Sequence, residues 1–204
     1  MKLQEALAEI RKTEKRNFDQ TIDLIINLKG IDLKRDQLNL VITIPHKIKD
    51  KKVGAFLKER SKVIDTITEP EFVKYKDKKP MRNLVKKYDY FIAVAPLMPK
   101  VAMAFGKILG PAGKMPSPQL GIINNETDAE IKKTLDKIDT SLKVRLKEAS
   151  IKLSIGKESM KDEAIIENIK SVYSTIENAL SKKKDNVRTV MIKFTMGKPV
   201  KVEM

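Results

Sequence analysis

Side chains that could support catalysis or hold a metal are scarce in this sequence of 204 residues. His46 is the only histidine and cysteine is absent, which excludes zinc sites built from Cys and His and triads built on histidine. The lack of cysteine argues against a disulfide framework and fits a reducing cytoplasm. We expect His46, which follows Pro45 at the end of an apolar strand, to be a turn residue. We expect no metal and no cofactor.

Two Gly-Lys pairs invite comparison with a phosphate-binding loop. That motif needs Ser or Thr after the lysine, and a glycine five residues before the second glycine. Gly113-Lys114 is followed by methionine, and Ile108 stands at its earlier glycine position. Gly156-Lys157 is followed by glutamate. Both pairs fail, no two carboxylates stand out as an acid/base pair, and we therefore expect a protein that is not an enzyme.

Net charge is the strongest global signal. The chain carries 42 Lys and Arg against 27 Asp and Glu, a formal charge of +15. Such a surplus is typical of a protein that binds a polyanion, most often nucleic acid, although a lysine-rich surface set by composition alone would look the same. Binding to a membrane surface would need a basic amphipathic helix with large apolar anchors, and the N-terminal segment has alternating signs instead. No apolar run approaches the roughly 18 residues of a membrane span, so we expect no membrane partner.

The two ends of the chain predict one α+β sandwich. Residues 2–16 are rich in helix formers with an apolar stripe. A period of two then begins, with apolar residues at every second position of 21–28. Further strands are predicted at 38–45, 151–156 and 188–197, and a long amphipathic helix at 165–180. In the last strand Val190, Ile192 and Phe194 should face inward.

The middle of the chain predicts a separate α/β unit. Apolar runs at 52–57 and 89–95 suit buried parallel strands. Helical patterns lie at 81–87, 97–107 and 127–138, and residues 139–146 are expected to form an antiparallel closing strand of this unit. We therefore predict an α/β (α+β) fold class with two domains: residues 1–50 plus 149–204 form a split α+β domain, and residues 51–148 form an inserted three-layer α/β domain.

Four motifs, in this order and spacing, resemble the ribosomal protein L-one family of the large-subunit stalk, the archaeal branch above all. They are RNFDQTIDLIINL at 16–28, LGPAGKMPSP at 109–118, GKESM at 156–160 and FTMGKPVKVEM at 194–204. The resemblance covers nearly the whole chain and implies a split terminal domain with a second domain inserted on two hinge segments. Two features depart from the family: Ala112 stands where an arginine is usual, and a helix common before Ile64 is not predicted.

The resemblance implies that the terminal domain binds a structured segment of large-subunit ribosomal RNA. The positions that match the family's binding motif are Phe18, Thr21, Asp23, Lys157, Ser159, Thr195, Met196 and Gly197, and Lys198 is a further phosphate contact. A hydroxyl and a carboxylate can bond to ribose 2′-hydroxyls, and a glycine allows close backbone approach. Judged without the resemblance, Phe18 could be a hydrophobic staple, residues 195–197 a plain turn and Asp23 a solvated charge.

The stretch 109–118 holds three prolines and two glycines, which predicts a preset loop that needs little ordering on binding. The resemblance implies that this loop belongs to the inserted domain and faces the exit-site transfer RNA. Lys107 and Lys114 are then candidate phosphate contacts. A structural loop that covers the sheet edge is the alternative.

Together these features predict a cytoplasmic, non-enzymatic protein of the large ribosomal subunit that binds stalk rRNA and, transiently, exit-site tRNA. The resemblance also implies a translational repressor that binds its own messenger RNA, and a monomer off the ribosome. One alternative is a ribosome-assembly factor with the same fold. Another is an enzyme with a nucleotide site in the inserted domain, which would need a Gly-rich loop where Pro96 and Leu97 stand.

Overall fold

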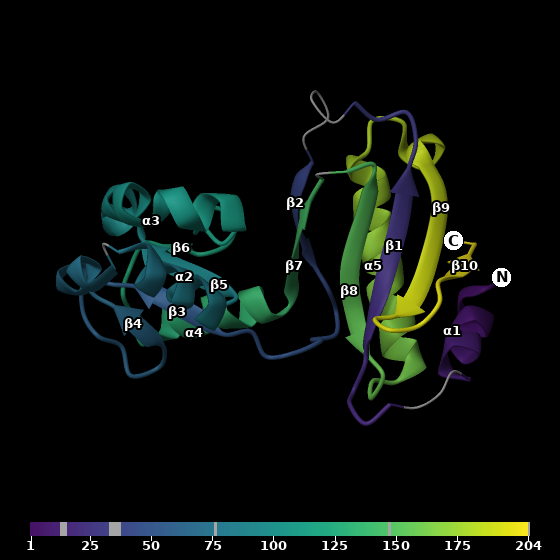
Figure 1. Cartoon of the computed structure of the whole chain (residues 1–204), viewed down its shortest axis with the longest axis horizontal. Helices are drawn as coiled ribbons and strands as arrows, with labels where there is room; N and C mark the ends of the chain where they lie inside the picture. Colours follow the sequence, from purple (N-terminus) through teal and green to yellow (C-terminus); the bar gives the residue numbers. More distant parts are fainter. Residues whose placement is uncertain (13–15, 33–37, 76, 147, 204) are drawn as a thin grey trace. The chain divides into compact units, whose positions relative to one another are not determined.

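A computed structural model describes residues 1–12, 16–32, 38–75, 77–146 and 148–203 of the chain (Figure 1). The chain forms two compact units. The terminal unit consists of Met1–Ile48 and Thr140–Met204, and the inserted unit of Lys49–Asp139. The chain therefore passes between the units twice. No helix of the described ranges is both long and apolar enough to cross a membrane.

The terminal unit is built on an antiparallel sheet with the strand order β10-β9-β1-β8. Its strands are β1 (Thr21–Leu28), β8 (Ser150–Lys157), β9 (Val187–Phe194) and β10 (Val200–Val202), and its helices are α1 (Leu3–Arg11), α5 (Asp162–Ala179) and the 3-10 helix η3 (Lys183–Asn186). The predicted strands around 21–28 and 151–156 and the helix around 165–180 are confirmed. The helix predicted at 2–16 ends at Arg11, with residues 13–15 outside the described residues, and the strand predicted at 188–197 ends at Phe194. The short β10 was not predicted.

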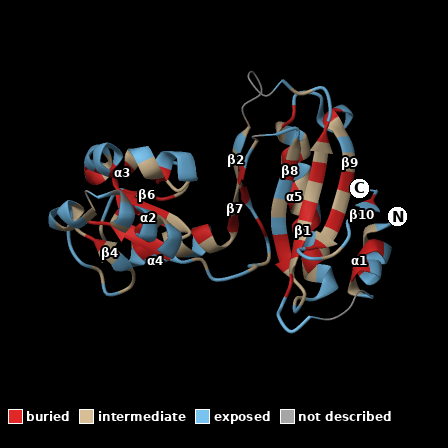
Figure 2. Ribbon diagram, in the orientation of Figure 1, coloured by how far each residue is buried: buried red, intermediate tan, exposed pale blue. Residues whose placement is uncertain are grey.

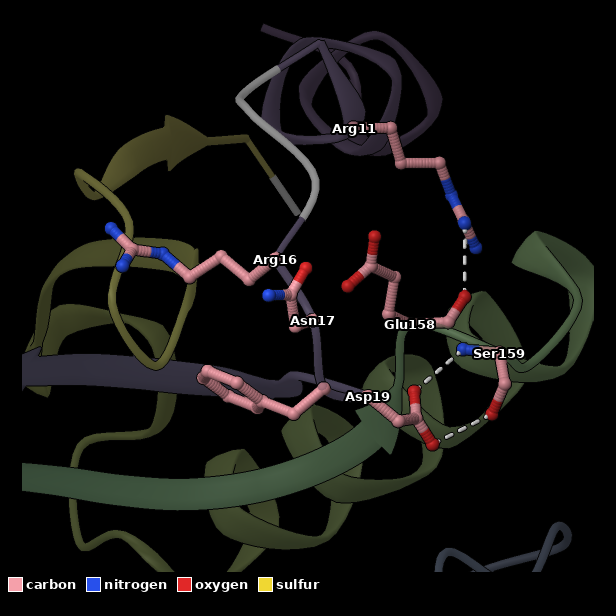
Figure 3. A pocket seen from close by; sticks show the side chains of 7 residues that line it. Arg11, Arg16, Asn17, Asp19, Glu158 and Ser159 are labelled. Carbon is pink, nitrogen blue, oxygen red and sulfur yellow. Dashed lines mark hydrogen bonds between the residues drawn. The ribbon is translucent and has the colours of Figure 1, made fainter.

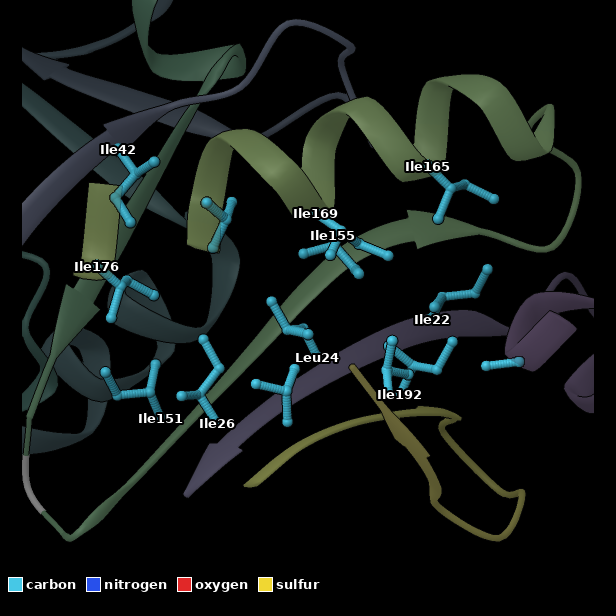
Figure 4. Close-up of a cluster of buried hydrophobic side chains, with 14 of the residues drawn as sticks. Ile22, Leu24, Ile26, Ile42, Ile151, Ile155, Ile165, Ile169, Ile176 and Ile192 are labelled. Carbon is cyan, nitrogen blue, oxygen red and sulfur yellow. The ribbon is translucent and has the colours of Figure 1, made fainter. Parts of the chain in front are cut away.

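One face of this sheet packs against the core, and the other face carries both polar and apolar side chains that are only half-buried in β1. β1 alternates strictly between half-buried and buried positions (Figure 2). Figure 4 shows Ile22, Leu24 and Ile26 between the sheet and α5. Their side chains belong to a core that is almost wholly aliphatic, which α1 also enters. The opposite face of β1 carries Thr21 and Asp23, as the period of two predicts.

A second, two-stranded sheet also belongs to the terminal unit. β2 (Asn39–Thr43) pairs antiparallel with β7 (Ser141–Arg145). Ile42 of β2 and Val144 of β7 are buried in the aliphatic core of the terminal unit. The prediction that residues 139–146 close the sheet of the inserted unit is therefore wrong, because these residues find both their strand partner and their apolar contacts in the terminal unit. The observed boundary falls at 139/140 for this reason.

The inserted unit has a parallel sheet with helices on both faces. Its strands are β3 (Val53–Phe56), β4 (Asp65–Ile67), β5 (Tyr90–Val94) and β6 (Ile122–Ile123), and its helices are η1 (Glu69–Tyr75), α2 (Lys78–Lys87), η2 (Ala95–Leu97), α3 (Met98–Ala112) and α4 (Asp128–Asp139). Helices α2 and α3 pack on one apolar cluster and α4 on another. The three layers and the two buried parallel strands are confirmed, and residues 57–64 contain no helix.

The stretch 109–118 differs from the preset loop that was predicted. Helix α3 continues to Ala112, so its first four residues are helical and Gly110 is an ordinary helix position. Pro111 is tolerated because it lies in the last turn, where its missing N–H removes one bond near the helix end. Gly113 ends the helix in the left-handed conformation with φ 71°, the conformation that glycine adopts most readily. Within this stretch, Gly113 is therefore the one residue whose backbone conformation favours glycine.

Candidate nucleic-acid interface

The predicted site residues of the terminal unit converge at one end of its main sheet. Thr21 is the first residue of β1 and lies opposite Lys157, the last residue of β8. Ile22 lies opposite Phe194, the last residue of β9, so that Thr195 follows directly beside Thr21. Antiparallel pairing brings the start of one strand next to the ends of its neighbours. Segments more than 130 residues apart in the chain are therefore assembled on one edge.

A β-bulge in β8 sets which way Lys157 faces. Ile22 pairs with Gly156, but Asp23 pairs with Ser154, so Ile155 is an extra residue in the register. Successive strand residues point to opposite faces, and one inserted residue reverses that order. The bulge thus puts Lys157 on the same face as Ser154 and beside Thr21. Sequence periodicity alone places it on the other face.

Hydroxyl groups and the carboxylate of Asp23 tie the three strands together on the open face. The Ser154 hydroxyl donates to Asp23 Oδ1 at 3.1 Å. The Thr195 hydroxyl lies 3.1 Å from the Thr21 carbonyl oxygen and 3.4 Å from Asp23 Oδ2. Asp23 therefore accepts hydrogen bonds on both oxygens, one from β8 and one from the residue that follows β9.

The turn that follows β8 is held by Asp19, a residue that the sequence did not single out. Asp19 Oδ1 accepts the Ser159 backbone N–H at 3.0 Å, and its Oδ2 accepts the Ser159 hydroxyl at 3.0 Å. The Lys157 ammonium lies 3.5 Å from Oδ2. Partial burial raises the pKa of Asp19, but the bonds from Ser159 and the charge of Lys157 outweigh it and hold the pKa below its ordinary value. These contacts favour the ionised form of the carboxylate.

Arg11 braces the same turn from α1. Its guanidinium donates to the carbonyl oxygens of Glu158 at 3.0 Å and Met160 at 2.9 Å, and it forms an ion pair with Asp162 at 2.6 Å. Figure 3 shows Arg11 and Asp19 reaching the turn from two sides. Arg11, the turn and residues 16–19 line an open hollow of about 580 Å³. The sequence gives no signal for this bracing, because it depends on contacts between residues about 150 positions apart.

Two large apolar side chains stand exposed beside these polar groups. Phe18 is 55% exposed and Met196 is 61% exposed. The interpretation of Phe18 as a hydrophobic staple is therefore wrong, and Met196 lies outside the core although it has the same parity as the buried Phe194. Gly197 donates its N–H to the Phe194 carbonyl at 2.9 Å, and an added Cβ would lie 3.3 Å from Phe194 Cβ. A tight turn, with no positive φ, accounts for this glycine, and Lys198 beyond it is exposed.

The two candidate lysines of the inserted unit differ in their surroundings. Lys107 is exposed on α3 and has no hydrogen-bond or ion-pair partner within the described ranges. The Lys114 ammonium donates to the carbonyl oxygens of Val85 at 2.8 Å and Tyr88 at 2.7 Å. These carbonyls end α2, where a cation is favoured by unsatisfied acceptors and by the helix dipole. Lys114 therefore caps a helix in this structure.

Comparison with known proteins places the chain among ribosomal proteins. A sequence model described as the ribosomal protein L1p/L10e family matches residues 10–198. The large ribosomal subunit protein uL1 of Thermococcus kodakarensis is 36% identical, with 99% of this chain and 97% of the relative covered. The protein of the same name from Pyrococcus horikoshii is 36% identical with 99% and 95% covered, and that from Archaeoglobus fulgidus is 32% identical with 95% and 93% covered. The chain belongs to the ribosomal protein L1 family, and its resemblance to the archaeal branch is confirmed.

Proposed function

We propose that this chain is a non-enzymatic RNA-binding component of the large ribosomal subunit and that its terminal unit holds the rRNA of the stalk. The name shared by its archaeal relatives, large ribosomal subunit protein uL1, supports the assignment to that subunit. The formal charge of +15 supports a polyanionic partner. The binding surface is the sheet end formed by the starts of β1 and the ends of β8 and β9.

The observation that carries this proposal is the exposure of Phe18 and Met196 beside polar groups that are already tied in place. Unpaired RNA bases stack on aromatic side chains, and ribose hydroxyls bond to fixed polar groups. Because Asp19, Asp23 and Arg11 hold the surrounding segments, little conformational entropy is lost when RNA binds. A rigid site of this kind suits recognition of a folded RNA segment.

Further partners are proposed for the same chain. The inserted unit faces exit-site tRNA on the ribosome, with Lys107 as its phosphate contact, whereas Lys114 would contribute only after leaving the end of α2. The rRNA surface also binds a segment of the protein's own messenger that mimics the stalk, which represses translation. Off the ribosome the chain is a cytoplasmic monomer.

A filter-binding or gel-shift titration tests this proposal. Wild-type protein should prefer stalk rRNA over an unrelated hairpin of equal length by roughly 10³-fold or more, the range of specific recognition. Phe18→Ala and Met196→Ala should reduce the affinity for stalk rRNA and leave the affinity for the unrelated hairpin unchanged. Met103→Ala is the matched control, because Met103 is 78% exposed in the inserted unit. Equal affinity of the wild type for both RNAs would overturn the proposal.

A further inference from the structure

We propose that Asp19 orients the Ser159 hydroxyl so that its oxygen accepts a hydrogen bond from RNA. The turn after β8 thereby recognises ribose 2′-hydroxyls. The inference rests on the proposed RNA-binding function and deepens it, since it names the RNA group that this turn recognises. It assigns Asp19 a positioning role with no direct contact to RNA.

Counting the protons of Ser159 leads to this assignment. Ser159 has two donors, its backbone N–H and its hydroxyl, and both lie 3.0 Å from oxygens of Asp19. An ionised carboxylate can only accept, and the bonds from Ser159 and the charge of Lys157 favour that ionised form. Both protons of Ser159 therefore point to Asp19. The side chain of this exposed residue then offers a ligand only the lone pairs of its hydroxyl oxygen.

The polarity of that oxygen decides which RNA groups fit. Phosphate oxygens are acceptors and cannot bond to it, whereas a ribose 2′-hydroxyl can donate. Every ribonucleotide carries this donor, and DNA lacks it. Base amino groups can also donate, but only the 2′-hydroxyl offers this donor at every nucleotide, so the acceptor is assigned to the ribose and phosphate is left to Lys157.

Thr195, at the other side of β1, has the same polarity. Its single hydroxyl proton faces the Thr21 carbonyl oxygen at 3.1 Å and Asp23 Oδ2 at 3.4 Å, both of which only accept. Thr195 is exposed as well. Two hydroxyls that flank the start of β1 thus present acceptors outward, each oriented by an acceptor behind it.

Electrostatics alone predicts the opposite role for Asp19. A carboxylate next to a polyanion is repulsive, so removing its charge should tighten binding of any nucleic acid. The Lys157 ammonium, 3.5 Å away, offsets that charge locally. If Asp19 positions Ser159, its conversion to Asn should weaken binding instead. The two Ser159 protons meet different oxygens of Asp19, and when the amide oxygen of Asn accepts the backbone N–H, its NH₂ group faces the hydroxyl and donates to it. The sign of the effect separates the two explanations.

The first experiment changes the RNA, one ribose at a time. A series of stalk rRNAs, each with one 2′-deoxy nucleotide, is titrated with wild type and with Ser159→Ala. At one nucleotide the wild type should lose roughly threefold to tenfold in affinity, the size of a typical hydrogen bond, and Ser159→Ala should lose no more at that position. Ser171→Ala removes a hydroxyl on α5 that donates to the Thr43 carbonyl of β2, and it should keep the wild-type pattern.

The second experiment uses Asp19→Asn in the full chain. It should bind all-ribose stalk rRNA roughly threefold to tenfold more weakly and lose the penalty at the same deoxy nucleotide. Asp185→Asn removes an equal charge before β9, about 26 Å of strand away from Thr195, and should not weaken binding. Tighter binding by Asp19→Asn, or specific wild-type binding with no cost at any deoxy position, would overturn this inference alone. Failure of the wild type to distinguish stalk rRNA from the hairpin would remove the proposed function and this inference with it.

Discussion

Strand β1 of the terminal unit alternates between half-buried and buried residues, whereas β3 of the inserted unit is buried at all four positions. The antiparallel sheet is packed on one face and keeps the other available, and the parallel sheet is covered by helices on both faces. Only the terminal unit can therefore present side chains from a sheet face in fixed register. The candidate contacts of the inserted unit are confined to a helix and the turn that follows it, and one of them, Lys114, is already used as a cap.

The two cores differ in composition as well. The terminal core is aliphatic, and among the residues that the structure describes Phe194 is its one buried aromatic side chain. In the inserted unit the cluster under α2 and α3 is built around ring contacts, with the Phe105 centroid 5.0 Å from Phe56 and 5.1 Å from Phe72, whereas the buried residues under α4 are aliphatic. Each unit therefore has its own set of apolar contacts, and damage to one core should leave the other intact.

The largest expected effect comes from removing a ring of the inserted core. Phe105→Ala should destabilise the inserted unit by about 3–5 kcal/mol, because Phe105 is fully buried, and should leave rRNA affinity unchanged. Phe194→Ala makes the same change in the terminal core and should reduce both stability and binding. Calorimetry with hydrogen exchange locates the lost protection in each case. Loss of rRNA affinity in Phe105→Ala alone would reverse the division between the units.

Two deletions of the inserted unit test where it ends. Replacing residues 49–139 with a short Gly-Ser linker should give a folded protein that keeps most rRNA affinity. Replacing residues 51–148 also removes β7, so that β2 loses its partner and Val144 leaves the core. Burial of one such side chain is worth about 1.5–3 kcal/mol, and the second variant should melt at a clearly lower temperature. Equal melting temperatures would mean that β7 contributes nothing to the terminal unit.

Sequence patterns predicted what depends on local periodicity. The alternation of Ile22, Leu24 and Ile26 fixed the packed face of β1 correctly, and the turn at Gly113 follows from its glycine. The patterns could not show that Asp19 meets Ser159, because that contact joins residues 140 positions apart.

The two features that the sequence patterns missed or misplaced, the bulge in β8 and the position of β7, both depend on pairing between strands far apart in the chain. The bulge at Ile155 appears only in the pairing of two strands, and β7 was assigned to the wrong unit because its partner β2 lies about 100 residues away. Long-range pairing, and not propensity, decides both. The residues most closely tied to the site, Asp19 and Arg11, are positioned by such contacts.

Met196→Ala tests whether the exposed edge of the terminal unit binds or merely ends a strand. Met196 is 61% exposed, so the substitution should change the free energy of unfolding by less than about 0.5 kcal/mol. Loss of a packed contact at an interface should weaken rRNA binding by about 2 kcal/mol. Ile192→Ala, in the core part of the preceding strand β9, should cost about 2–5 kcal/mol of stability and reduce binding only through unfolding. A matching drop in melting temperature for the two variants, with normal binding by folded Met196→Ala, would make Met196 a core residue.

The smallest expected effect concerns single phosphate contacts, and it contrasts a lysine of each unit. The slope of log affinity for stalk rRNA against log salt concentration is negative. Lys157→Gln should reduce its magnitude by about 0.7–0.9, because one phosphate fewer releases its counterions. Lys114→Gln should leave that slope unchanged and lower the melting temperature of the inserted unit, because the lost ammonium satisfies two carbonyls at the end of α2. Titrations between about 50 and 200 mM salt measure the slope.

Lys198→Gln, at an exposed position of the terminal unit, sharpens this last test because Lys198 makes no ion pair within the described ranges. If the slope counts phosphates, Lys157→Gln and Lys198→Gln should lower it by equal steps and the double variant by their sum. If it reports only the net charge of the protein, Lys114→Gln should lower it by the same step. Equal slopes for the three single variants would therefore contradict the distinction between the two units. A slope that stays at the wild-type value only in Lys114→Gln would assign the phosphate contacts to the start of β1 and the ends of β8 and β9.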